Sequence, residues 1–507
     1  MKRFVALFLV AVLALSTVSV MAAEAPVRGG TLNAAVAAKW TSLDPTTSSA
    51  RAGDKFILNQ LYETLIVEDA NGYQPGLAES WVAEDKSLTL TLRQGVKFHD
   101  GTDFNAEAVK FVLDRGMTAE AKATYKSEVA DVENVEVVDE YTVRINLKNP
   151  SAVIVGALSN YAGFMISPAA IEKFGEDIVR NPVGTGPFMM EEAVDGDHIT
   201  LVRNPEYWKQ AADGQPLPYL DKVVITVMSD DASKLLNLKS GAISLIDNIQ
   251  NINIATLDTA EITALKTSAT KTYKMMVNVN DEGPLSDPKV RQAMAYALYR
   301  DAFVQAISAG YGYIGPWNIT PDQWFYSEGT PYTYDVEKAK ALLAEAGYPD
   351  GFETTFHVTA REPDKTIIQI IQGQLAEVGI KGEIVPLEKL AFNDLWKNGE
   401  GKIGLNFCPV PKPDPYIQIE QFFGSAGNNN FTGYASEEFD SLLEQSVRTY
   451  DLEERKALIA QMQQVFLTDS PEVMLFHNPT YMAYRNDLHG FYTDLEGGWI
   501  LSEAYIK

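Results

Sequence analysis

The residues that could act as catalysts or metal ligands do not form a known catalytic pattern. No two histidines have the four-residue helical spacing of a zinc hydrolase; they are His99, His198, His357, His477 and His489. There is no G-x-S-x-G nucleophile motif and no Walker-type phosphate loop, and Gly184-Thr185-Gly186 lacks the third glycine of a dinucleotide-binding turn. Acidic pairs such as Glu191-Glu192 are expected by chance among 68 acidic residues. The sequence therefore predicts no catalytic residue, metal or cofactor, with a secreted hydrolase as the alternative.

Aromatic and polar residues suited to binding gather in several predicted loops. A ligand enclosed by protein loses its water, so its apolar parts need aromatic walls and its charges need opposite charges. The candidates from these loops are Trp40, Thr46, Ser48, Tyr161, Trp317, Phe407 and Tyr416. For each aromatic residue taken alone, a place in the core is the alternative.

The segment from Phe407 to Tyr416, FCPVPKPDPY, differs from the other loops because every second residue from Pro409 to Pro415 is proline. Proline cannot donate a backbone hydrogen bond, so neither a helix nor a central strand can run through this segment. We predict a rigid loop that forms either a ligand wall, with Cys408, Pro409 and Pro411 in it, or a structural connection between domains. Asp414 is expected to tie this loop to its own domain.

The elements that must position these loops follow from local patterns. Leu88, Leu90 and Leu92 alternate with polar residues, which predicts a half-buried strand. Asn105 is a candidate N-cap for a helix with Val109, Val112 and Leu113 on one face. The apolar run from Val223 to Met228 predicts a central strand buried on both faces.

Helices are predicted more densely after residue 287. Asp287-Pro288 gives an N-cap followed by proline at the first helical position. Asp335 and Gly347 are expected to begin and end a second helix, and Asp451 with Glu454 has the spacing of a capping box. Strands and helices together predict an α/β fold.

Size and charge limit the classes of protein. A chain of 507 residues, 46% hydrophobic, can bury several cores and suggests about two to four domains. Its formal net charge of −26 excludes binding to nucleic acid or an anionic membrane by charge alone. An anionic ligand would need a local basic site.

The N-terminus has the order of a secretory signal. Lys2-Arg3 precede an apolar run from Phe4 to Leu15, and small residues follow around Ala22 and Ala23. The run is too short for a membrane-spanning helix, and no cysteine lies near the cleavage region. We predict a signal peptide over residues 1–23 and a periplasmic protein that is not a lipoprotein. Cys408 is the only cysteine, so an intramolecular disulfide is excluded.

Four segments resemble one known family. They are LAESWVAEDKSLTLTLRQGVKFHDGTDFNAEAVKF from Leu77, NPVGTGPF from Asn181, RNPEYW from Arg203, and VNVN with DPKVRQA from Val277 and Asp287. Together they resemble the peptide/nickel/opine-type solute-binding proteins of bacterial ABC importers, in the order that this family has them.

The resemblance implies a two-lobed α/β fold with a ligand cleft between the lobes. Lobe I would comprise residues 24–273, with an inserted subdomain at about 55–190, and lobe II residues 274–477, before residues 478–507 return to lobe I. The expected function is capture of a small solute by lobe closure and delivery to the inner-membrane permease, as a monomer. Peptides or peptide-like and opine-like compounds are the expected ligands, with oligosaccharides as the alternative.

The same resemblance points to a changed binding site. In peptide-binding members, a W-x-x-D-x-x-D/E-P loop supplies a pocket tryptophan and an aspartate for the ligand's amino group. Alignment on Asp414-Pro415 puts Cys408 at the tryptophan and Pro411 at the aspartate. Lys389 aligns with a pocket aromatic residue, whereas Arg361 has the place of the arginine that holds the ligand carboxylate. A ligand with an anionic end and no obligatory free amine is therefore expected.

Overall fold

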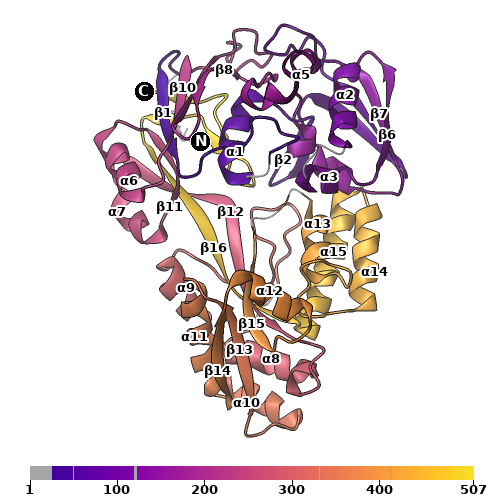
Figure 1. Ribbon diagram of the computed structural model, residues 1–507, viewed down its shortest axis with the longest axis vertical. Coiled ribbons are helices and arrows are strands. Elements are labelled where there is room, and N and C mark those ends of the chain that lie inside the picture. Colours follow the sequence, from indigo (N-terminus) through magenta and orange to yellow (C-terminus); the bar gives the residue numbers. More distant parts are fainter. Residues whose placement is uncertain (1–25, 49–50, 119–122, 330–331, 410–411, 413) are drawn as a thin grey trace, which may run out of the picture.

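The computed structural model describes residues 26–48, 51–118, 123–329, 332–409, 412 and 414–507, and one ten-stranded mixed sheet runs through it (Figure 1). In spatial order its strands are β14 (Ile380–Leu387), β13 (Phe352–Thr359), β15 (Ile403–Cys408), β12 (Ile262–Val277), β16 (Glu472–Arg485), β11 (Leu245–Ile249), β1 (Thr31–Val36), β10 (Lys222–Val227), β9 (His198–Arg203) and β8 (Phe188–Val194).

The two longest strands, β12 and β16, connect the two halves of the molecule. They pair antiparallel from Ile262 opposite Arg485 to Met276 opposite Glu472. In Figure 1 they run between an upper half, lobe I, with β1 and β8 to β11, and a lower half, lobe II, with β13 to β15. A register shift between Lys266 and Thr270 interrupts the ladder partway along.

Lobe I carries a second sheet of its own. Its four strands are β4 (Ala78–Glu84), β5 (Ser87–Leu92), β7 (Thr142–Leu147) and β6 (Val132–Asp139). The predicted strand at Leu88–Leu92 is confirmed as β5. Helix α2 (Ala106–Gly116) contacts this sheet, and the Asn105 side chain accepts a hydrogen bond from the Ala108 amide, as the predicted N-cap requires.

The remaining elements of lobe I are a small hairpin, several helices and a few short strands. The hairpin is β2 (Ile66–Asp69) with β3 (Gly72–Pro75). The helices are α1 (Arg51–Leu61), α3 (Ala123–Glu128), α4 (Val153–Ala157), α5 (Pro168–Phe174), α6 (Asp231–Ser240) and α7 (Ile254–Leu257). After β16 the chain adds only the two-residue strands β17 (Leu488–His489), β18 (Tyr492–Thr493), β19 (Trp499–Ile500) and β20 (Tyr505–Ile506).

Lobe II is richer in helices, as the sequence predicts. They are α8 (Pro288–Ala297), α9 (Asp301–Ser308), α10 (Val336–Glu345), α11 (Asp364–Ala376), α12 (Lys389–Lys397), α13 (Pro415–Phe423), α14 (Glu437–Arg448) and α15 (Leu452–Asp469). Asp287, Asp335 and Asp451 each accept a backbone hydrogen bond at the start of their helix, so these three predicted N-caps are confirmed. Gly347 has φ +93° just past the end of α10, the conformation that favours glycine.

Each lobe has its own apolar core. Leu32, Val36 and Ile57 belong to the large lobe I cluster, whereas Met275 and Phe356 belong to a separate cluster in lobe II. Helix α13 to helix α15 enclose a third cluster, around Trp317. Tyr73 of lobe I packs against both the lobe I cluster and this third cluster, so the two lobes are also in direct contact.

The prediction for Val223–Met228 was partly wrong. The strand exists as β10 and lies between β1 and β9, but only Val223 and Ile225 are buried. Val224 and Thr226 stay partly exposed, so one face of this strand is not fully covered. A near-continuous apolar run therefore predicted the strand correctly but overstated its burial.

In the described part of the chain, no helix combines the length and the apolar character that a membrane span needs.

Two buried histidines predict how the stability of the fold depends on pH. Burial lowers the pKa of His99 and that of His477, each from 6.5 to about 4. His477 lies on β16, and its Nδ1 is 2.8 Å from the Thr272 hydroxyl on β12. Between these pH values the unfolded chain binds protons that the folded protein does not, so stability falls as the pH drops from 6.5 toward 4.

Replacing His477 with glutamine should remove part of this acid sensitivity. Between pH 7 and pH 4.5, wild type should lose about 2–3 kcal/mol more unfolding free energy than the variant, measured by urea denaturation. His198→Gln is the control, because the hydrogen bond to Asp197 raises the pKa of that partly exposed histidine. Equal pH dependence in wild type and His477→Gln would contradict the assignment.

Candidate functional site

Strand direction turns the carboxyl ends of both halves of the sheet toward each other. Strand β12 runs from lobe I into lobe II, and β15 is antiparallel to it, so β15 and its parallel neighbours β13 and β14 end toward lobe I. Strand β16 runs back, and β11 is antiparallel to it, so β11, β1 and β10 end toward lobe II. Ligands of open α/β sheets bind outside the carboxyl ends of the strands. The carboxyl ends of β13, β14 and β15, which point toward lobe I, are together called the carboxyl edge of lobe II.

Three predicted site residues meet at this edge. Arg361 lies two residues after β13 ends, Lys389 lies two residues after β14 ends, and Phe407 is near the end of β15. These strands are neighbours in the order β14-β13-β15, although the three residues are far apart in the sequence.

Arg361 is held from one side only. Its Nε donates to Asp364 Oδ2 at 2.8 Å, and the Thr359 hydroxyl donates to the same buried carboxylate. Its two Nη atoms make no hydrogen bond within the described residues, and its side chain is 51% exposed. The guanidinium is thus fixed in direction while its outer edge stays open to a carboxylate.

Lys389 lies close enough to Arg361 to respond to its charge. Partial burial and then the Arg361 cation lower the pKa of Lys389, whereas Asp364 opposes this shift. Lys389 makes no ion pair among the described residues. A bound anion would relieve the repulsion between these two cations.

Phe407 supplies an apolar surface beside the cations. The guanidinium carbon of Arg361 is 5.5 Å from the Phe407 ring centroid, and Tyr273 of β12 packs on Phe407 at 5.9 Å. Phe407 is half-buried, whereas the next residue, Cys408, is buried, and burial raises the pKa of its thiol to about 11. Pro409 is exposed, and its carbonyl accepts from Gln418 Nε2 at 3.1 Å.

Other predicted residues of lobe II lie away from this edge. Trp317 is 0% exposed and packs against Phe423, Phe439 and Phe466. Tyr416 lies in the first turn of α13 and is half-buried against the cluster around Trp317. Pro411 lies outside the described residues.

The predicted residues of lobe I are all buried within it. Trp40 is 8% exposed in the segment after β1, and Thr46 accepts from Arg115 Nη1 at 2.8 Å. The Ser48 hydroxyl donates to Asp54 Oδ2, and Tyr161 packs against Phe164. The structure does not bring these four side chains to the carboxyl edge of lobe II, and a ligand contact for them stays a prediction.

Two residues of the site were missed by sequence reasoning. Asp364 positions Arg361. Its place three residues after that arginine, at the start of a helix, could have predicted their ion pair. Lys271, on β12, lies with its Nζ 6.0 Å from the Phe407 ring centroid. No sequence signal distinguishes Lys271 from the other lysines.

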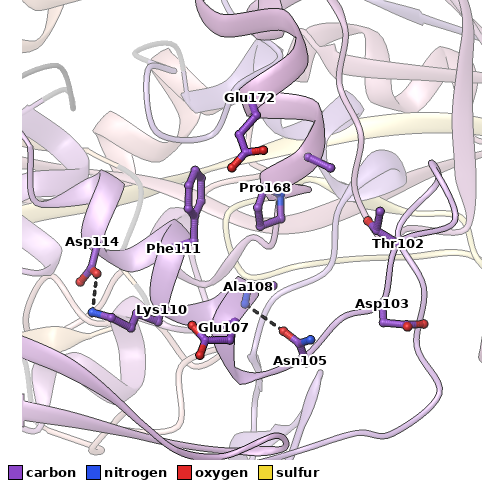
Figure 2. A pocket seen from close by; sticks show the side chains of 11 residues that line it. Thr102, Asp103, Asn105, Glu107, Ala108, Lys110, Phe111, Asp114, Pro168 and Glu172 are labelled. Carbon is purple, nitrogen blue, oxygen red and sulfur yellow. Dashed lines mark hydrogen bonds and ion pairs between the residues drawn. The ribbon is translucent and has the colours of Figure 1, made fainter.

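A separate pocket of about 470 Å³ opens in lobe I between α2 and α5 (Figure 2). Its wall carries the acidic side chains of Asp103, Glu107, Asp114 and Glu172, and Lys110 is 2.6 Å from Asp114. It contains no predicted site residue. Among the described residues, no group of three acidic, histidine or cysteine side chains is placed to hold a metal ion.

Comparison with known proteins decides the family. Residues 72–430 match the model of the bacterial extracellular solute-binding proteins, family 5, middle part. The chain belongs to this family. It is 30% identical over 492 residues to the glutathione-binding protein GsiB of Salmonella typhi, covering 93% of this chain and 94% of that protein.

Solved structures of similar proteins have the same fold. HbpA2 from Haemophilus parasuis matches with a TM-score of 0.86 and 26% identity, covering 94% of this chain and 100% of that one. The periplasmic binding protein DppA from Helicobacter pylori, in complex with the peptide STSA, matches with a TM-score of 0.71 and 25% identity over 94% and 98%. The expected two-lobed fold is confirmed.

Family 5 proteins bind small solutes and deliver them to the permease subunits of ABC importers, and in Gram-negative bacteria they are periplasmic. This chain is therefore the solute-binding component of such an importer. The proline-rich loop predicted from the sequence follows β15 in this chain.

Asp414 fixes the end of that loop. Its carboxylate accepts from Arg455 Nη1 at 2.6 Å and Nη2 at 2.8 Å, and both side chains are almost fully buried. It also accepts from the Tyr416 amide and so caps α13. Tyr73 of lobe I approaches the same carboxylate at 3.4 Å, which places the pair where the two lobes touch.

Asp414→Asn should destabilise the protein strongly, because it leaves the buried Arg455 without its counter-charge. We expect a loss of about 3–5 kcal/mol in unfolding free energy, measured by urea denaturation. The control is Glu444→Gln, since its pair with Arg448 is mostly exposed and should contribute less than about 1 kcal/mol. Equal effects of the two substitutions would show that the Asp414 pair is not structural.

Proposed function

We propose that this solute-binding protein captures a peptide or a peptide-like solute, opine-like compounds included, through an anionic group, and releases it unchanged. The observation that carries the proposal is Arg361 at the carboxyl edge of lobe II. Its Nε is bound to Asp364, and its two Nη atoms make no hydrogen bond in the described part of the chain.

Charge makes this arrangement selective. The chain as a whole carries −26, so its field repels anions. Arg361 and Lys389 reverse the sign locally, and the planar fork of an arginine matches a carboxylate in geometry as well as charge. Phe407 beside them offers the apolar contact that a side chain of the solute needs.

The printed ligands of similar proteins agree with a carboxylate-bearing solute. GsiB is named as a glutathione-binding protein, and DppA is in complex with the peptide STSA. The loop where peptide binders carry an aspartate for the amino group holds Pro411 in this sequence. The proposal therefore requires an anionic end and does not require a free amine.

The proposal also includes export, oligomeric state and the boundaries of the lobes. The protein is exported by a signal peptide over residues 1–23, carries no lipid anchor and acts as a monomer. Lobe I comprises residues 24–273, with a subdomain at about 55–190, and residues 478–507, and lobe II comprises 274–477. Both proposed crossings fall within the long strands β12 and β16.

Solute binding should close the lobes about the β12–β16 pair. Native mass spectrometry of the protein as purified identifies any bound solute, and a panel of peptides, glutathione, opines and maltooligosaccharides can then be screened by melting temperature. Small-angle scattering should show a smaller radius of gyration with every stabilising solute. Stabilisation without compaction would contradict closure, and turnover of a panel member would establish hydrolysis instead.

Arg361→Ala should weaken binding of a carboxylate solute by about 2–5 kcal/mol in isothermal titration, chiefly through faster release. Arg361→Lys should restore little of it, because an ammonium cannot reproduce the two parallel hydrogen bonds. Arg448→Ala, at an exposed arginine of α14, is the matched control.

Unchanged affinity in both Arg361 variants would contradict the anionic anchor. If maltooligosaccharides alone stabilised the protein, the alternative of an oligosaccharide-binding protein would replace the proposal.

A further inference from the structure

Lys271, on β12 beside β15, extends the row of side chains found at the carboxyl edge of lobe II. The four neighbouring strands β14, β13, β15 and β12 place Lys389, Arg361, Phe407 and Lys271 side by side in that order. Arg361 and Lys271 both approach the aromatic ring, with the guanidinium carbon and Nζ at 5.5 and 6.0 Å from its centroid. Two strand spacings separate them, roughly 10 Å at about 4.8 Å per strand.

Among the described residues, no carboxylate neutralises the charge of Lys271. Strand β12 carries three lysines: Lys266 pairs with Asp322 at 3.2 Å, and Lys274 pairs with the buried Glu472 at 2.7 Å. Lys271 is exposed and has no ion pair among the described residues. Its ammonium therefore lies near Phe407 and Arg361 without a carboxylate partner in the described part of the chain.

We infer that Lys271 is a second anion anchor, so that the solute carries two anionic groups. One is held by Arg361 and Lys389, the other by Lys271, and the part of the solute between them lies against Phe407. This inference rests on the proposed function, since it takes Arg361 as the first anchor. A dipeptide or tripeptide with an acidic side chain, a γ-glutamyl peptide or a dicarboxylic opine has the required chemistry.

The position of Lys271 also links the second anionic group to closure. Lys271 lies opposite Asn478 in the β12–β16 ladder, on the strands that connect the lobes. A solute held at both Arg361 and Lys271 spans from the body of lobe II to the connecting strands. A solute with one anionic group can occupy only one of these anchors at a time.

The test compares matched solutes on matched variants. The probes are glutathione and γ-glutamylalanine, which carry two carboxylates, and the C-terminal amide of each, which carries one. The variants are Lys271→Met, which keeps the length of the side chain, Lys271→Arg, which keeps the charge, and Arg361→Ala. Lys381→Met is the control, because Lys381 is an exposed lysine at the opposite end of β14.

Wild type should bind at least one dicarboxylate about tenfold or more tightly than its amide, because closure desolvates the second ion pair. Lys271→Met should lose this preference while binding the amide as wild type does, and Lys271→Arg and Lys381→Met should keep it. The preference should also weaken with added salt.

Each other result overturns the inference. If Lys271→Met kept the preference while Arg361→Ala lost binding, Lys271 would not be an anchor and the proposed function would stand. If neither substitution changed the affinity, both would fail. A wild-type protein that no dicarboxylate stabilises at millimolar concentration would also rule out the second anchor.

Discussion

The antiparallel pair of β12 and β16 is the constraint on which the rest of the structure depends. Two long strands of opposite direction pass between the lobes. Strand β15 pairs antiparallel with β12 and β11 pairs antiparallel with β16, and this fixes the direction of the strands on either side. The carboxyl ends of β1, β10 and β11 therefore face those of β13, β14 and β15. Because backbone groups at strand ends are free of the ladder, both lobes present loops and side chains to the space between them.

The cations near the lobe boundary differ in how far carboxylates neutralise them. Most cations near the lobe boundary are already paired: Lys55 with Glu496, Lys266 with Asp322, and Arg455 with Asp414. Arg361 is paired on one side only, through its Nε. The buried Asp364 fixes the guanidinium without neutralising its outer edge, so the cost of ordering the side chain is met before a solute arrives. Under the proposed function, this fixed geometry distinguishes Arg361 from a solvated surface charge.

Local signals in the sequence were reliable where a local interaction decides the structure. Asn105, Asp287, Asp335 and Asp451 cap helices because each side chain bonds a backbone amide only two or three residues away. The aromatic residues behaved differently. Trp317 in a loop next to glycine and proline has the same local pattern whether it faces solvent or core, and here it is packed among three phenylalanines from distant helices.

The sequence by itself determined the family, the α/β class and the helix starts, since motif and short-range pattern contain that information. Arg361 and Lys389 were singled out as candidate cations only by the family resemblance. Only the tertiary structure decided which residues meet. Lys271 and Phe407 lie on two strands, and Arg361 and Lys389 directly follow two others; the four strands are neighbours in the sheet, and the residues are separated by up to 136 positions in the chain. Long-range strand order, which depends on the packing of both cores, brought them to one edge and left Trp317, Cys408 and Tyr161 buried.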